Sequence, residues 1–138
     1  MKISVDQYLV RLSNDLKYPD LFTTLSFRNY KLHIPDFEVI EITQTDEVIL
    51  MSSPVGKLIE NLDEDKVLAY LLNANYLGQG TGKSFLALHH DNVTIVLSQT
   101  IFLEIDYLDF KERVEQMLNY IDYLKGHLLT KIPTFLKE

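Results

Sequence analysis

The sequence contains no cysteine. This absence excludes disulfide bonds, thiolate catalysis and metal sites built on cysteine, and it is consistent with a reducing compartment. Long hydrophobic runs are lacking too, because the longest uncharged stretch, residues 67–82, is too short and too polar to span a bilayer. The first residues carry Asp6 and Arg11 where a signal peptide would be apolar. We therefore expect a soluble intracellular protein with no membrane insertion.

Positive charge is scarce. Thirteen Lys and Arg residues stand against twenty Asp and Glu residues, for a formal net charge of -7 and a pI of about 5.0. Such a chain repels phosphate backbones and anionic lipids, so we expect no nucleic-acid partner. The hydrophobic fraction of 46% is typical of a folded protein. No linker or repeat is visible, so residues 1–138 are predicted to form a single domain, with 126–138 as a candidate flexible tail.

Hydrophobic periodicity predicts the order of the elements. Steps of four and three residues predict a first helix that presents one apolar face, made by Val5, Leu9, Leu12 and Leu16. Alternation and β-branched residues then predict a three-stranded antiparallel meander over residues 28–53. A helix over residues 63–76, a hairpin around Asp91 and Asn92, and a last helix capped by Asp109 and Glu112 follow. The order α-βββ-α-ββ-α predicts an α+β fold with a twisted antiparallel sheet packed against helices.

Residues 78–84, GQGTGKS, invite comparison with a nucleotide-binding loop. The phosphate-loop pattern consists of a glycine, four further residues and then Gly-Lys-Ser, and the position of that first glycine is Leu77 here. The expected context is also reversed, since a helix precedes this segment and a strand pair follows it. We therefore predict that Gly78, Gly80 and Gly82 form a structural turn and that no cofactor binds there.

Other chemical signals are weak. His89 and His90 would point to opposite faces if both lay in a strand, so a shared metal ion is not expected. The acidic cluster of residues 60–65 lacks the spacing of a calcium loop, and no serine lies in a nucleophile elbow. We expect no catalytic residues and no metal site, and hence no enzyme.

The second predicted helix is apolar almost all round, although a helix covered on one side normally carries a polar stripe. Burial inside the monomer is one explanation, but a chain of this length offers little cover. The simpler explanation is a homodimer. The expected dimer-interface residues are Val67, Leu68, Tyr70, Leu71 and Leu72.

The second half of the chain resembles the class I type III secretion chaperones, the Tir-chaperone-like (CesT-type) family. That family shows a Leu-Leu-x-Ala-Asn helix end, a Gly-x-x-Thr-Gly turn, a strand with alternating leucines, and a Leu-Asp-x-x-x-Phe step before a long final helix. The residues that carry the resemblance here are Leu71, Leu72, Ala74, Asn75, Gly78, Thr81, Gly82, Leu86, Leu88, Leu108, Asp109 and Phe110. They match as an ordered set, with small offsets, and the N-terminal half matches by pattern only.

The resemblance implies a homodimer of the bacterial cytoplasm that binds the N-terminal segment of a secreted effector and has no enzymatic activity. It also suggests contact with the secretion ATPase. An extended segment needs apolar pockets and strand edges to offset its lost entropy. The expected partner-binding residues lie on the first helix and the first meander strand: Leu9, Leu12, Leu16, Tyr30, Leu32 and Ile34. Taken one at a time, each of these residues fits an ordinary core position better.

Two alternatives to a secretion chaperone remain at the level of sequence. One is a protein-binding adaptor with the same fold and no link to secretion, because a fold does not determine a function. The other is a small enzyme or nucleotide binder. Retention of one dominant partner through that partner's N-terminal segment would distinguish the chaperone from the adaptor. A nucleotide titration would test whether the chain is a small enzyme or nucleotide binder.

Overall fold

Six strands form one antiparallel sheet in the order β1-β2-β3-β4-β6-β5. The computed structural model describes residues 4–57, 64–75, 84–91 and 93–136, without the side chains of 64, 67, 70, 74 and 126–136. The elements in chain order are α1 (Val5–Leu16), β1 (Phe22–Ser26), β2 (Asn29–Leu32), β3 (Ile40–Gln44), β4 (Val48–Lys57), α2 (Glu64–Asn75), β5 (Phe85–Leu88), β6 (Thr94–Phe102) and α3 (Tyr107–Leu136).

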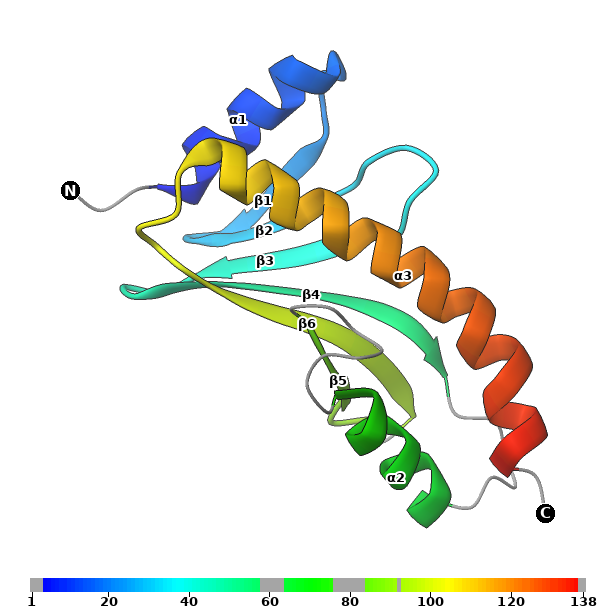
Figure 1. Cartoon of the computed structure of the whole chain (residues 1–138). Helices are drawn as coiled ribbons and strands as arrows, with labels where there is room; N and C mark the ends of the chain where they lie inside the picture. The colour runs from blue at the N-terminus through cyan, green and yellow to red at the C-terminus, as the bar shows by residue number, and fades with distance from the viewer. Residues whose placement is uncertain (1–3, 58–63, 76–83, 92, 137–138) are drawn as a thin grey trace.

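The helices are placed by their apolar faces. In Figure 1, α1 and the first half of α3 lie side by side over one face of the sheet, and α2 lies at its β5 end. The side chain of Phe110, on α3, is fully buried between helix and sheet, as is that of Leu9 on α1. The expected α+β fold with an antiparallel sheet is thereby confirmed.

One strand, β1, was not predicted. The meander before α2 therefore has four strands, because β1 pairs with β2 through Phe22 opposite Leu32 and Thr24 opposite Tyr30. Four of the five β1 residues are exposed. A strand exposed on both faces shows no alternation of apolar and polar residues, and alternation was one of the signals that identified the other strands.

A proline stands in the central strand β4, where it cannot donate a ladder hydrogen bond. The register with β6 shifts between Pro54 and Gly56, where a bulge inserts Val55. The Val55 side chain is buried, on the same face of β4 as Ile49, Met51 and Ser53. The strand therefore tolerates its proline without losing its buried face.

Helices α1 and α3 differ in how their first turns are capped. Ser4 is the N-cap residue of α1, but its hydroxyl bonds the Asp6 carboxylate instead of a backbone N–H. The last helix begins at Tyr107, and its cap is Asp106, whose Oδ1 accepts from the Asp109 backbone N–H at 2.8 Å. The predicted capping box of Asp109 and Glu112 was therefore wrong by one turn.

Candidate protein-binding surfaces

The six predicted partner-binding residues belong mainly to the core of this chain. Leu9 and Leu12 of α1 and Tyr30 and Leu32 of β2 are buried in one hydrophobic cluster, and Leu16 and Ile34 are half-buried against that cluster. Polar substitution of the four buried residues would disrupt folding before it affected a partner. Only Leu16 and Ile34 retain enough exposed surface to contact another chain.

The most exposed apolar side chains of this region lie instead on the unpredicted strand and its turn. Leu25, on β1, is 53% exposed, and Phe27, in the turn to β2, is 84% exposed. Strand β1 is the first strand of the sheet, with β2 as its one neighbour in the described part of the chain. Its outer edge therefore offers backbone N–H and C=O groups to an added strand.

A hollow of about 360 Å³ lies beside this edge. Thr24 and Phe27 contribute to its wall from β1 and the turn, Tyr30 from β2, and Ser4 and Asp6 from the start of α1. Burial raises the pKa of the Tyr30 hydroxyl, and the negative charge of Asp6 raises it further. The phenol therefore remains a neutral hydrogen-bond donor at physiological pH.

The turn that carries Phe27 is held in place by Arg28. The Arg28 backbone has a positive φ of 62°, and its guanidinium pairs with Asp46 at 2.6 Å and lies 5.1 Å from the centre of the Phe27 ring. These contacts restrain an aromatic ring that is otherwise surrounded by solvent. We call the free edge of β1, together with Phe27 and the adjoining hollow, the β1 surface.

Helix α2 carries a second exposed apolar patch. Leu68 and Leu72 are 47% and 70% exposed, and they lie one turn apart on the same face of the helix. Leu71 is buried against the body of the chain. The side chains of Val67 and Tyr70 lie outside the described residues, as do Gly78, Gly80 and Gly82 of the expected turn. Of the five predicted interface residues, the structure thus exposes two and buries one.

Asn75 holds the end of α2 to the sheet, a role that the sequence did not reveal. Its side-chain amide donates to the Leu86 backbone carbonyl at 2.8 Å and accepts from the Leu86 N–H at 2.6 Å. The side chain thus satisfies both backbone groups of one residue on the edge strand β5. This fixes the position of the patch formed by Leu68 and Leu72.

The histidine pair was misplaced by the sequence argument. His89 and His90 follow the end of β5 at Leu88, so they lie in the turn, and their ring centres are 3.9 Å apart. Asp91 accepts from the backbone N–H groups of Val93 and Thr94, which lowers the pKa of its carboxyl group. Among the residues that the structure describes, no group of three His, Asp or Glu could hold a metal ion.

Comparison with known proteins identifies the family of the chain. The sequence model of the Tir chaperone protein (CesT) family matches residues 9–125. No curated protein sequence matches the chain. No helix in the described part of the chain is long and apolar enough to cross a membrane.

Solved structures share the fold at low sequence identity. The HopA1–SchA chaperone–effector complex matches with a TM-score of 0.66 and 16% identity over 88% of this chain and 93% of the other. The ExsC–ExsE complex matches with a TM-score of 0.72 and 14% sequence identity, over 91% of this chain and 96% of the other. The heterodimeric ExoU–SpcU complex from the type III secretion system of Pseudomonas aeruginosa matches with a TM-score of 0.65 and 15% sequence identity, over 89% of this chain and 96% of the other. At these identities the likeness establishes the fold.

Proposed function

Because the chain belongs to the Tir chaperone protein (CesT) family, we propose that it is a type III secretion chaperone. It binds the N-terminal segment of a secreted effector and keeps that effector soluble and competent for export. The observation that carries the proposal is the family match over residues 9–125, which spans nearly every described element. Similarity to structures described as chaperone–effector and type III secretion complexes supports the same function.

The β1 surface is the proposed binding site for the effector segment. An extended segment that pairs with β1 gains main-chain hydrogen bonds without requiring a particular sequence. Its alternate side chains then face the two sides of the sheet. On one side they meet the hollow near Tyr30, and on the other they meet Leu25, which alternates with Thr24 along the strand.

This arrangement suits a client that is unfolded before it binds. A disordered segment loses conformational entropy for every residue that it orders, and apolar contacts must offset that loss. Exposed Leu25 and Phe27 supply apolar area without any rearrangement of the core. Half-buried Leu16 and Ile34 remain part of the proposed contact, whereas Leu9, Leu12, Leu32 and Tyr30 support it from beneath.

Dimerisation is proposed through α2. Two copies that pack Leu68 and Leu72 against each other would bury apolar side chains that one chain leaves in water. Val67 and Tyr70 remain predicted members of this interface. We further propose that the dimer acts in the bacterial cytoplasm, by binding and not by catalysis, and that it contacts the secretion ATPase during export.

The experiment that tests the function is co-purification from the native host, followed by peptide identification and truncation of the partner. A secretion chaperone retains one dominant partner through that partner's N-terminal segment, and removal of the segment abolishes retention. Retention through a folded domain of the partner would instead indicate an adaptor with the same fold.

A further inference from the structure

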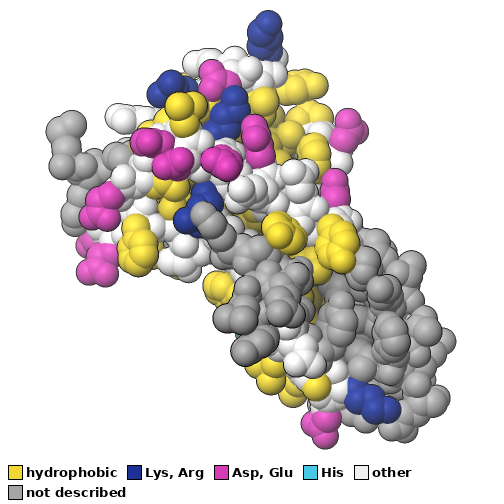
Figure 2. All heavy atoms as spheres, viewed as in Figure 1, with side chains coloured by type: hydrophobic (Ala, Val, Ile, Leu, Met, Phe, Trp, Pro, Cys, Tyr) yellow, Lys and Arg dark blue, Asp and Glu magenta, His cyan; other side chains and the backbone are white. Residues whose placement is uncertain are grey.

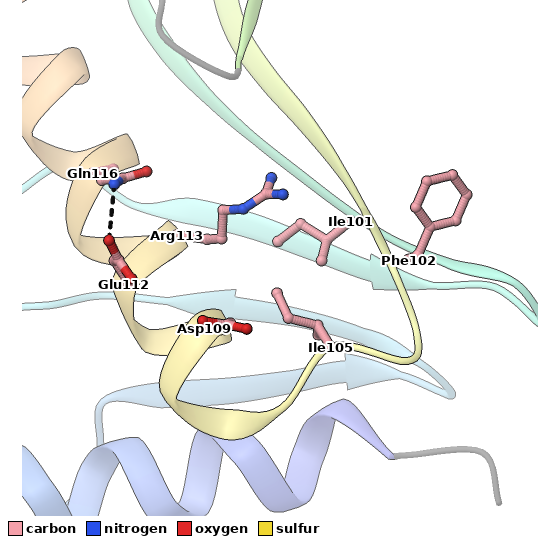
Figure 3. Close-up of a pocket in the computed structure, with 7 residues that line it drawn as sticks. All are labelled: Ile101, Phe102, Ile105, Asp109, Glu112, Arg113 and Gln116. Carbon is pink, nitrogen blue, oxygen red and sulfur yellow. Dashed lines mark hydrogen bonds between the residues drawn. The ribbon is translucent and has the colours of Figure 1, made fainter.

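A second hollow, of about 300 Å³, lies between the end of β6 and the first turns of α3 (Figure 3). Its apolar wall is formed by Ile101, which is buried, half-buried Ile105, and Phe102, which is 71% exposed. The opposite wall is the charged face of α3. We call this hollow the α3 pocket.

The Arg113 guanidinium in the α3 pocket forms no ion pair with the nearby Asp109 carboxylate. Asp109 and Arg113 are four residues apart on α3, a spacing at which opposite charges normally pair on a helix surface. Arg113 instead donates from Nη1 to the Oε1 of Gln99 at 3.2 Å. Figure 3 shows the Arg113 side chain directed from α3 toward Ile101 on the sheet.

Gln99 fixes this inward orientation. Its side chain is only 2% exposed on β6, and its Nε2 donates to the Ser84 hydroxyl at 2.9 Å. A buried amide engaged at both ends cannot move without losing hydrogen bonds in a region of low dielectric. The Arg113 guanidinium is thereby held at the floor of the α3 pocket.

The charged side chains of the α3 pocket form no salt bridge with one another. Within the described residues, none of the ion pairs involves Asp109, Glu112 or Arg113. Glu112 accepts one long hydrogen bond, from the Nε2 of Gln116 at 3.3 Å. The pocket thus presents two carboxylates beside an apolar wall, and a guanidinium with donors to spare. In Figure 2, acidic side chains gather over the region where α3 begins.

We propose that the α3 pocket binds a segment of a partner polypeptide in which a basic residue adjoins an apolar one. Charge complementarity selects this occupant. The lysine or arginine places its cation at Asp109 and Glu112, and its aliphatic stem packs on Ile105 and Phe102. Arg113 donates to a backbone carbonyl of the same segment. The inference rests on the proposed function only in taking a polypeptide as the class of occupant.

The α3 pocket is separate from the β1 surface. Lys111 and Tyr107 face α1, where both contact Asp15. Residues 109, 112, 113 and 116 lie on the other flank of the helix, as its 3.6-residue repeat requires. A long partner segment can therefore occupy both sites, and each site can be altered without touching the other.

The test is an NMR titration of the ¹⁵N-labelled full chain with acetyl-Leu-Arg-Leu-amide, and with acetyl-Leu-Glu-Leu-amide as the charge-reversed probe. The arginine peptide should shift the resonances of the α3 pocket saturably, and the glutamate peptide should not. The double variant Asp109→Asn, Glu112→Gln should weaken the arginine peptide about tenfold, because a charge-assisted hydrogen bond is lost. The control Glu115→Gln, Asp122→Asn removes the same charge from exposed positions elsewhere on α3 and should change binding less than about twofold.

Three results would overturn the proposal. The first is equal binding of the two peptides, or no saturable shift with either peptide up to its solubility limit. The second is unchanged binding of the arginine peptide by the double variant. The third is altered sedimentation of the double variant, which would show that a second copy of this chain occupies the pocket. Leu25→Asp should leave peptide binding unchanged, so failure at the β1 surface and failure at the α3 pocket are distinguishable.

Discussion

Asn75, the last residue of α2, makes two hydrogen bonds with the backbone of Leu86 on β5, at 2.8 and 2.6 Å. The side chain behaves like a short added strand, because it satisfies one N–H and one C=O of the same residue. This contact gives a physical reason for the asparagine at the end of the Leu-Leu-x-Ala-Asn motif. It couples the exposed patch of α2 to the rigid sheet.

Asn75→Ala should therefore lower the free energy of unfolding by about 1–3 kcal/mol, since two buried backbone groups lose their partner. Urea denaturation measures the change. Asn73→Ala is the matched control, because Asn73 is exposed on the same helix and should show almost no loss. Equal stability of the two variants would mean that Asn75 does not anchor α2.

Tyr107 on α3 contacts two residues of α1, and these contacts join the two helices that cover the sheet. The Tyr107 hydroxyl donates to the Asp15 Oδ2 at 2.6 Å, and the Arg11 guanidinium lies 4.1 Å from the centre of the Tyr107 ring. Tyr107→Phe should reduce the free energy of unfolding by about 1–2 kcal/mol, because the bond is made to a charged acceptor. Tyr120→Phe is the control, since the Tyr120 hydroxyl has no hydrogen-bond partner among the described residues.

The hydrogen bond between Tyr107 and Asp15 predicts that the free energy of unfolding depends on pH in the alkaline range. Burial raises the pKa of Tyr107, and its bond to Asp15 and the charge of that carboxylate raise it further. A tyrosine with a raised folded-state pKa contributes stability that is complete below its unfolded pKa of about 10 and is lost as pH rises beyond it. The stability difference between wild type and Tyr107→Phe should therefore shrink above about pH 10. A difference that stays constant to pH 11 would contradict the assignment.

The α2 patch predicts self-association. Leu72→Asp should shift the chain from dimer to monomer at micromolar concentration, because it places a charge in a desolvated interface. Sedimentation velocity measures the change. Leu108→Asp, an equally exposed leucine on α3, should remain dimeric. A wild-type chain that sediments as a monomer would show that the patch has another use.

The β1 surface predicts where partner affinity resides. Leu25→Asp and Phe27→Asp should each weaken binding of the partner's N-terminal segment by about 2 kcal/mol or more, the size of an interface hot spot, without unfolding the chain. Isothermal titration calorimetry measures the affinity, circular dichroism checks the fold, and Leu108→Asp again serves as the control. Normal affinity in both variants would move the binding site away from this edge.

The sequence predicted the elements whose side chains alternate or repeat, because burial on one face leaves a periodic signal. It missed β1, whose residues are exposed on both faces. It also assigned Leu9, Leu12 and Leu32 to partner binding, although they are core residues. Apolar periodicity records that a face is covered, but not whether the cover comes from the same chain or from another one. The contacts of Asn75 and Arg113 join segments far apart in sequence, and no local pattern reveals them.

The most direct test of the central claim is amide hydrogen exchange of the chain with and without the partner's N-terminal segment. If the segment adds a strand to β1, the outward-facing amides of Phe22–Ser26 acquire hydrogen bonds, and their exchange should slow at least about tenfold. The other edge strand, β5, serves as the internal reference and should be unaffected by the segment. Unchanged exchange in β1 under saturating partner would contradict strand addition at this edge.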